Sequence, residues 1–141
     1  MTRSGPSASL RVPVREEADV AVARGTARDL ARGEGFPEGR AAAIATAVTE
    51  VARNIVVHAG AGEILLHVEE RGGRHAIVVV ARDESPGIPD VEEAMTDGFS
   101  TSDGLGLGLP SARRLMDEFT LVSEVGKGTI VTMTKWAHAA R

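Results

Sequence analysis

Cysteine is absent from the sequence, and its absence excludes several kinds of functional site at once. With no thiol among its 141 residues, the chain can form no disulfide, no thiolate metal centre and no cysteine nucleophile. A chain without cysteine fits a reducing compartment, so we expect a cytoplasmic protein. Aromatic residues are also scarce, at 3% of the chain, and a core must therefore be built from valine, isoleucine, leucine and alanine.

Long apolar runs and an excess of positive charge are missing as well. No segment approaches the roughly 20 apolar residues that a membrane span requires, and the N-terminal residues lack the apolar stretch of a signal peptide. The formal net charge is -4 and the isoelectric point is near 5.6, so no positive field favours nucleic acid or an anionic lipid surface. We therefore expect neither nucleic acid nor a membrane as a partner.

The size and composition of the chain indicate one globular domain. A length of 141 residues suits a single core, and 43% apolar with 26% charged residues is typical of a globular protein. Residues 1–9 are rich in serine, glycine and proline, which predicts a disordered lead. Residues 10–141 then form the single predicted domain.

Hydrophobic periodicity and glycine-rich turns predict an α+β fold. The order is β, α, α, β, β, loop, α, β, β, which favours a two-layer sandwich with helices over one face of a mainly antiparallel sheet. The expected strands are 10–14, 63–69, 75–82, 120–125 and 129–136, and the expected helices are 16–32, 37–58 and 109–118, with a short helical candidate at 89–95.

Glu50 and Asn54 form the first candidate for a functional site. They stand four residues apart on the second predicted helix, which places both side chains on one line of that helix. Ala43 and Ala47 lie on the same line, so a carboxylate and an amide stand beside small residues. Taken alone, the pair is more typical of the solvent-facing side of an amphipathic helix.

The second candidate is the sequence "DESPG" at residues 83–87. Asp83 ends a predicted strand, and Gly87 permits a close backbone approach or a positive φ angle. The same letters are also typical of an ordinary turn closed by an aspartate side chain.

The third candidate is the glycine-rich stretch before the third helix. Gly104, Gly106 and Gly108 alternate with Leu105 and Leu107, which exposes backbone N–H groups suited to an anion such as phosphate. The stretch fits neither a Walker motif nor a dinucleotide-binding fingerprint. A plain linker would not place a leucine between successive glycines, because each leucine would go unburied.

Other polar residues give weaker signals. The sequence "GKGT" at 126–129 is typical of a hairpin turn. His58, His67, His75 and His138 show no metal-ligand spacing, and we assign none of them a catalytic role.

Taken in order, these segments resemble the ATP-binding boxes of the GHKL superfamily. "EVARN" at 50–54 resembles the N box, "DESPG" at 83–87 the first glycine box, and "GLGLG" at 104–108 the second. Gly128 and Thr129 resemble the small late motif. The resemblance implies the Bergerat-type ATPase fold and ATP as the bound nucleotide.

Within that superfamily, the chain most resembles the RsbT-type serine/threonine kinases of bacterial partner-switching modules. The likeness extends over nearly the whole chain from Leu10, and it is strong in "TEVARNIVVHAGAGEI" and "SEVGKGT". The sequence departs from the superfamily at Ser85, which stands where the first glycine box has a glycine.

The resemblance implies a role for each box. Asp83 would accept a hydrogen bond from the adenine amino group, with Thr129 nearby and Gly87 letting the base approach. Asn54 would bind Mg²⁺, and Glu50 would accept the proton of the incoming serine or threonine hydroxyl.

The glycine-rich stretch would fold over the phosphates. Residues 104–108, namely Gly104, Leu105, Gly106, Leu107 and Gly108, would donate backbone N–H groups to the phosphates, and Asp97 to Asp103 would be mobile without nucleotide.

The family also implies protein partners. The substrate would be a STAS-domain antagonist phosphorylated on serine or threonine, and the released kinase would then bind a PP2C-type phosphatase. Two alternatives remain open: a non-catalytic, ATP-sensing regulator that binds a sigma factor or phosphatase, and a detached catalytic domain of a histidine kinase.

Overall fold

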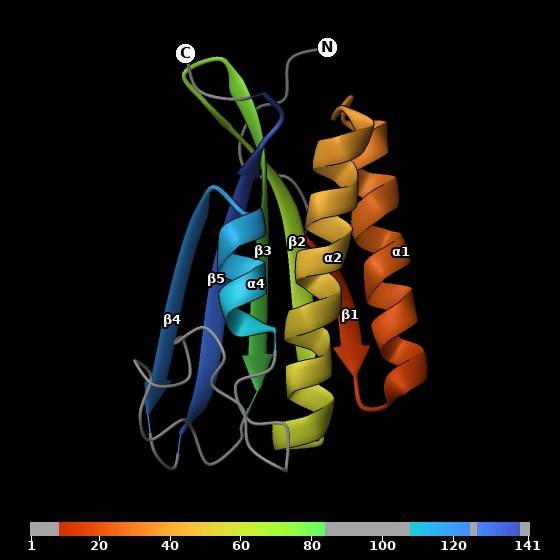
Figure 1. Ribbon diagram of the computed structural model, residues 1–141, viewed down its shortest axis with the longest axis vertical. Helices are drawn as coiled ribbons and strands as arrows, with labels where there is room; N and C mark the ends of the chain where they lie inside the picture. The colour runs from red at the N-terminus through yellow and green to blue at the C-terminus, as the bar shows by residue number, and fades with distance from the viewer. Residues whose placement is uncertain (1–8, 84–107, 125–126, 139–141) are drawn as a thin grey trace.

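A computed structural model describes residues 9–83, 108–124 and 127–138 (Figure 1). Residues 1–8 of the predicted lead and the helical candidate at 89–95 lie outside these described residues. Within them the chain begins its first strand at Leu10, as the alternating pattern predicts.

Within the described part of the chain, five antiparallel strands form one sheet. In spatial order they are β1 (Leu10–Val14), β2 (Gly62–Arg71), β3 (Arg74–Asp83), β5 (Gly128–Trp136) and β4 (Glu118–Glu124). The β2–β3 and β4–β5 pairs are the two hairpins that the glycine-rich turns predict.

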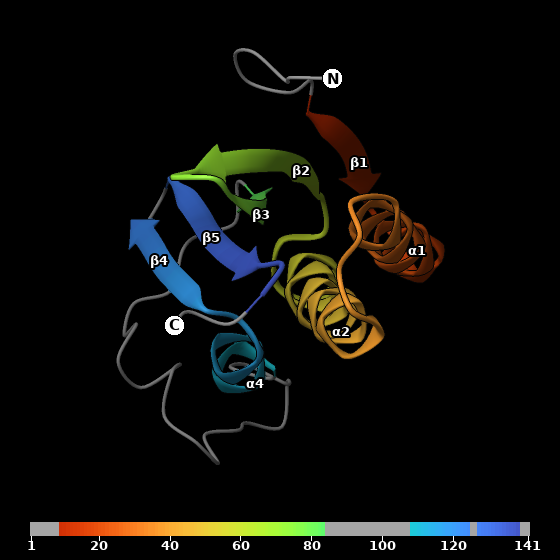
Figure 2. The same cartoon turned by 90° about the horizontal axis from the view of Figure 1, so that it is seen from above.

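The helices lie together on one face of this sheet (Figure 2). They are α1 (Glu17–Gly33), α2 (Glu38–Asn54) with the π-helical turn η1 (Ile55–Ala59), and α4 (Leu109–Leu115). The predicted two-layer α+β architecture is therefore confirmed. Among the described residues, no helix is long and apolar enough to cross a membrane.

The core lies between the helices and the sheet. Alternate residues of each strand face inward, as in Ile64 and Leu66 of β2, and meet the apolar stripe of α2. Burying one such side chain contributes roughly 1.5–3 kcal/mol, so this layer fixes α2 firmly on the sheet. The largest fully buried side chains are Val14, Ile44, Val48, Val51, Ile55, Ile64, Leu66, Ile77, Val79 and Met133.

Two predicted helix ends differ from the structure. The helix predicted to reach His58 changes to a π turn after Asn54, and the amide of Gly60 donates to the Ile55 carbonyl five residues back, at 2.9 Å. Sequence periodicity cannot separate a π turn from the end of an α-helix, because one turn is too short to show a period.

The helix predicted to run from Leu109 to Glu118 ends at Leu115, and Glu118 begins β4 instead. Met116 is already extended, and the Asp117 amide donates to the Thr134 carbonyl at 2.9 Å. Pairing with a distant strand thus overrides the local helical pattern.

Candidate functional site

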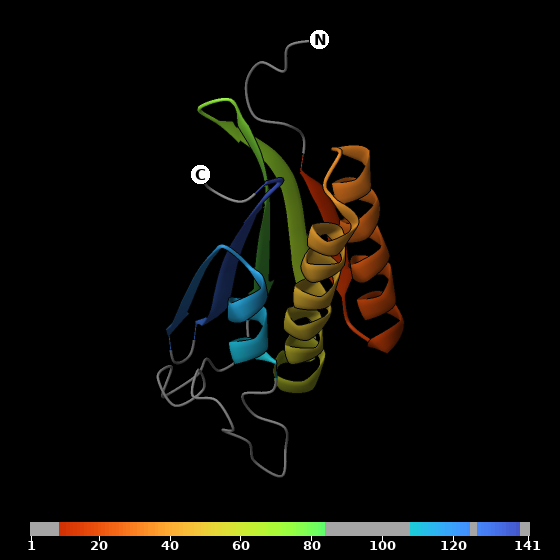
Figure 3. The ribbon, with the colours of Figure 1, turned by 45° about the horizontal axis from the view of Figure 1, so that its top comes forward.

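The predicted site residues within the described chain gather at one end of the molecule. At this end α2 and β3 finish, while α4 and β5 begin (Figures 1 and 3). These elements carry Glu50, Asn54, Asp83, Gly108 and Thr129 to the same region. The remaining predicted residues, Gly87, Gly104, Leu105, Gly106 and Leu107, lie outside the described residues.

The sheet contributes a polar row to this end. Asp83 is the register partner of Thr129, which is in turn the partner of Ser123 on the edge strand. The hydroxyl oxygens of Ser123 and Thr129 are 2.9 Å apart, and Thr129 is only 7% exposed. A carboxylate and a fixed hydroxyl pair therefore stand side by side on the helix-facing side of the sheet, which suits recognition of a polar heterocycle.

Gly62 lets the sheet approach the end of α2 closely. It is the register partner of Asp83, and a Cβ built on it would lie 2.9 Å from Ile55 Cγ2 and 3.1 Å from Asp83 Cβ. The same Cβ would also clash with the Arg82 carbonyl oxygen. Only glycine allows this approach. Gly62 therefore brings Asp83 on β3 close to Ile55, the residue that follows Asn54.

Asn54 ends α2 with a buried polar atom that lacks a partner. Its Nδ2 is inaccessible to solvent and has no hydrogen-bond partner among the described residues. Rotation of the amide group exchanges its nitrogen and oxygen, so this buried position can present either a donor or an acceptor. Because an unsatisfied buried amide is costly, its retention here favours a role in binding a ligand.

His58, which the sequence gave no reason to select, shares this property. Its Nε2 is buried and has no hydrogen-bond partner within the described part of the chain. The residue lies in the π turn η1, one turn beyond Asn54. Such turns occur frequently at functional sites. Two orphaned polar atoms thus lie at neighbouring positions at the end of α2.

Glu50 lies against the start of α4. Gly108 precedes that helix with φ +80°, and a Cβ built on it would lie 2.9 Å from both Cβ and Cδ of Glu50, and closer still to Oε2. Glu50 is half-buried, and Ala47, one turn before it, is fully buried. The space above the small residues of α2 is therefore occupied by α4, which packs on α2.

These residues fit a magnesium-bound nucleotide. Mg²⁺ in phosphate sites is usually held by one or two protein oxygens, with phosphate and water supplying the rest. No cluster of three or more acidic, histidine or cysteine side chains able to hold a metal occurs in the described ranges. The orphaned amide of Asn54, one turn after Glu50 on α2, matches this sparse donor set.

A cavity of about 500 Å³ opens at the same end, and its lining includes outward-facing residues of the sheet. Arg11, Glu63 and Arg82 are among its lining residues, and Arg82 and Arg11 lower the pKa of the Glu63 carboxyl by hydrogen bonding to it. Asp83 also borders this cavity, but Glu50 and Asn54 do not. Gly62 also lines the cavity, which therefore adjoins the cluster at the start of β2 and the end of β3 without reaching Glu50 or Asn54.

Comparison with known proteins connects this chain to nucleotide chemistry. A family model described as a histidine kinase-like ATPase domain matches residues 12–135. The serine/threonine-protein kinase RsbT of Bacillus subtilis (strain 168) is 45% identical over 125 residues, covering 89% of this chain and 94% of that relative. The anti-sigma F factor of Geobacillus kaustophilus (strain HTA426) is 38% identical over 107 residues, covering 70% of this chain and 69% of that relative.

A further anti-sigma F factor, from Caldanaerobacter subterraneus subsp. tengcongensis, is 36% identical over 97 residues, which cover 66% of this chain and 68% of that relative. The range matched by the family model includes all five described site residues.

Proposed function

Because this chain belongs to the histidine kinase-like ATPase family, we propose that it is an ATP-dependent serine/threonine protein kinase of a partner-switching module. The observation that carries the proposal is the position of Glu50. Its carboxylate lies one turn before Asn54 on the same side of α2, where a base would stand beside a bound triphosphate. A pure nucleotide sensor has no need of a base at that position.

We assign nucleotide binding to both layers of the fold. Asp83 accepts a hydrogen bond from the adenine amino group, with Thr129 beside it and Gly87 close to the base. Gly104, Leu105, Gly106, Leu107 and Gly108 donate backbone N–H groups to the phosphates.

Asn54 holds Mg²⁺, which would offset the negative charge of the triphosphate. The remaining task of the protein is to position the hydroxyl and the γ-phosphate in line.

Glu50 is the proposed general base. As the substrate hydroxyl oxygen forms its bond to the γ-phosphorus, the hydroxyl proton passes to the Glu50 carboxylate. The bond between the γ-phosphorus and the bridging oxygen breaks, and its electron pair leaves with ADP. A base placed within hydrogen-bond reach typically contributes about 10²–10⁴-fold to such a step.

The partners are proposed from the family resemblance. The substrate is a STAS-domain antagonist that is phosphorylated on serine or threonine, and a PP2C-type phosphatase binds the released kinase. We place these events in the cytoplasm, which agrees with the absence of cysteine from the chain.

Incubation with γ-labelled ATP, Mg²⁺ and a candidate STAS-domain protein tests this function. We expect acid-stable label on a serine or threonine of the partner, and no label with the Asn54→Ala variant. Acid-labile label would instead assign a histidine kinase. Nucleotide binding without any label, across a panel of STAS-domain proteins, would contradict the kinase and leave the ATP-sensing regulator.

His58 is expected to contact the bound nucleotide, because a phosphate oxygen would satisfy its buried Nε2. Replacing His58 with phenylalanine keeps a ring of similar size and removes the unsatisfied nitrogen. We expect ATP affinity to fall by about tenfold, the loss of one hydrogen bond to a charged group, while the nucleotide-free protein is no less stable.

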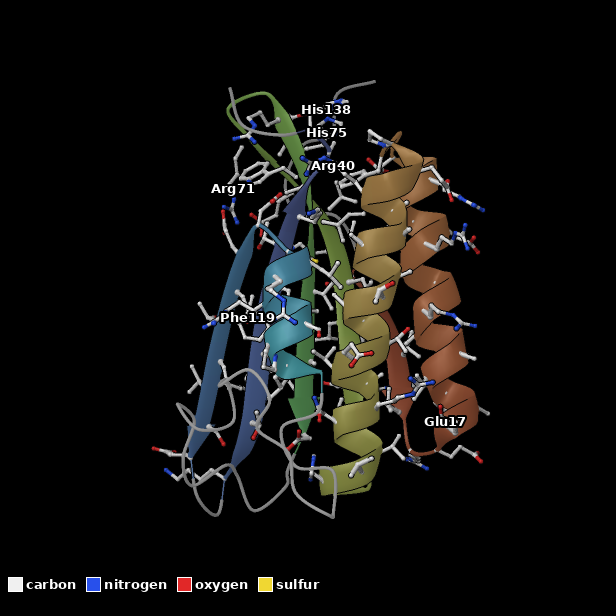
Figure 4. The ribbon with its side chains drawn as sticks, in the orientation of Figure 1. Glu17, Arg40, Arg71, His75, Phe119 and His138 are labelled. Atoms are coloured by element: carbon white, nitrogen blue, oxygen red, sulfur yellow. The ribbon has the colours of Figure 1, made fainter. Side chains whose placement is uncertain are left out.

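Equilibrium ATP titration and thermal unfolding of the same preparations test the His58 prediction. His138→Phe is the control, because His138 lies at the opposite end of the molecule (Figure 4). Unchanged ATP affinity in His58→Phe would contradict the contact.

A further inference from the structure

Gly108 differs from other glycines that share its backbone conformation. Gly35 and Gly73 both have φ +81°, close to the +80° of Gly108, and a Cβ built on either would meet nothing within 4 Å. A Cβ built on Gly108 would instead meet the Glu50 side chain at three atoms. Position 108 therefore requires glycine for two reasons. Its backbone is left-handed, and the Glu50 side chain leaves no room for a Cβ.

The backbone at Gly108 is held in place by the helix that follows it. Leu109, Pro110 and Ala112 are buried, and Leu109 and Ala112 belong to the main core cluster. The Ala112 amide also donates to the Gly108 carbonyl, at 2.8 Å. Gly108 cannot withdraw from Glu50 without disturbing this packing, so any conflict between the two must be resolved by movement of the glutamate.

We propose that Gly108 is a positioning residue for Glu50. The backbone of Gly108 lies against the Glu50 side chain and limits the rotamers that Glu50 can adopt beside Asn54. The catalytic consequence rests on the proposed function, in which Glu50 is the base, but the contact itself does not. The sequence of the glycine-rich stretch accounts for phosphate binding and gives no reason for a glycine opposite the base.

A thermal-unfolding cycle on the full chain tests the contact without nucleotide. Gly35→Ala is the control, because it measures the strain of alanine at a positive φ angle without a neighbouring side chain. Gly35 lies at the opposite end of the molecule, since the preceding Glu34 is near His75 (Figure 4). We expect Gly35→Ala to lower the melting temperature by about 3–5 °C and Gly108→Ala by at least about twice that, given the size of the domain.

The Glu50→Ala background completes the cycle, because it removes the carboxylate that the new methyl group meets. Alanine at position 50 keeps the Cβ, which lies 2.9 Å from the built methyl group, so the effect of Gly108→Ala should fall only partway toward that of Gly35→Ala. An equal loss for Gly108→Ala with and without the Glu50 carboxylate would overturn the proposal, as would equal losses for Gly108→Ala and Gly35→Ala in the wild-type background.

Kinetics on the same proteins test the catalytic consequence. We expect Gly108→Ala to reduce kcat for phosphate transfer by about tenfold or more, with a smaller change in ATP affinity. Unchanged kcat in a variant that shows the excess unfolding would overturn the positioning role. If the wild-type chain transfers no phosphate, the proposed function fails, and the unfolding cycle still decides whether Gly108 constrains Glu50.

Discussion

Replacing Glu50 with glutamine is expected to abolish phosphate transfer while leaving Mg-ATP bound. Glutamine has nearly the same shape, so it preserves the contact with Gly108 and the packing of α4 on α2. It cannot accept the hydroxyl proton, and the loss of a positioned base should reduce kcat by about 10²–10⁴-fold. Single-turnover transfer to the partner protein, measured beside equilibrium ATP binding, separates the two effects.

Asn54→Ala provides the contrasting result. It removes the amide that we assign to Mg²⁺, so both nucleotide binding and transfer should be lost, whereas Glu50→Gln should lose only transfer. Equal transfer rates for the wild type and Glu50→Gln would remove the base assignment. A large loss of ATP affinity in Glu50→Gln would instead place the carboxylate among the binding groups.

The fold could be predicted from the sequence because its signals are local. Alternation of apolar residues marks β2 and β3, the paired glycines at 72–73 mark the turn between them, and helical spacing marks α1 and α2. The end of α4 was predicted wrongly because it depends on a distant strand. The Asp117 carboxylate accepts a hydrogen bond from the Trp136 backbone amide at 2.9 Å, and no local sequence pattern indicates this bond.

The site was predictable where it depends on spacing along one element, and not where it depends on pairing between elements. The four-residue separation of Glu50 and Asn54 indicates a shared helix face from sequence alone. The role of Gly62 was not predicted, because its position beside Asp83 follows from the β2–β3 register. His58 gave no signal, because burial of Nε2 follows from tertiary packing after a π turn.

Gly108 falls between these two cases. The sequence indicates a glycine at the start of a helix. Its contact with Glu50 depends on how α4 packs on α2, which the sequence does not indicate. The spacing along α2 predicts small residues beside Glu50 and Asn54, and the structure adds that Ala47 is fully buried and that α4 packs on α2. Small residues on α2 and a glycine before α4 thus both allow the two helices to pack closely.

Replacing Asp83 with asparagine is expected to weaken ATP binding and to change nucleotide preference. The carboxylate can only accept hydrogen bonds, which suits the amino group of adenine and opposes the carbonyl oxygen that guanine carries at the same ring position. Losing the charge should raise the Kd for ATP by about tenfold to a hundredfold, as expected for a hydrogen bond to a charged group. The amide can donate to that carbonyl, so GTP should bind no worse and the preference for ATP should narrow.

Titrations of ATP and GTP into the wild type, Asp83→Asn and the exposed control Asp29→Asn measure this preference. The ratio of the two affinities matters more than either value, because general damage to the site weakens both nucleotides together. Thr129 and Ser123 keep their hydroxyl contact in the variant, so the rest of the sheet row remains in place. An Asp83→Asn protein that binds ATP and GTP with the wild-type ratio would exclude a direct contact between this carboxylate and the base.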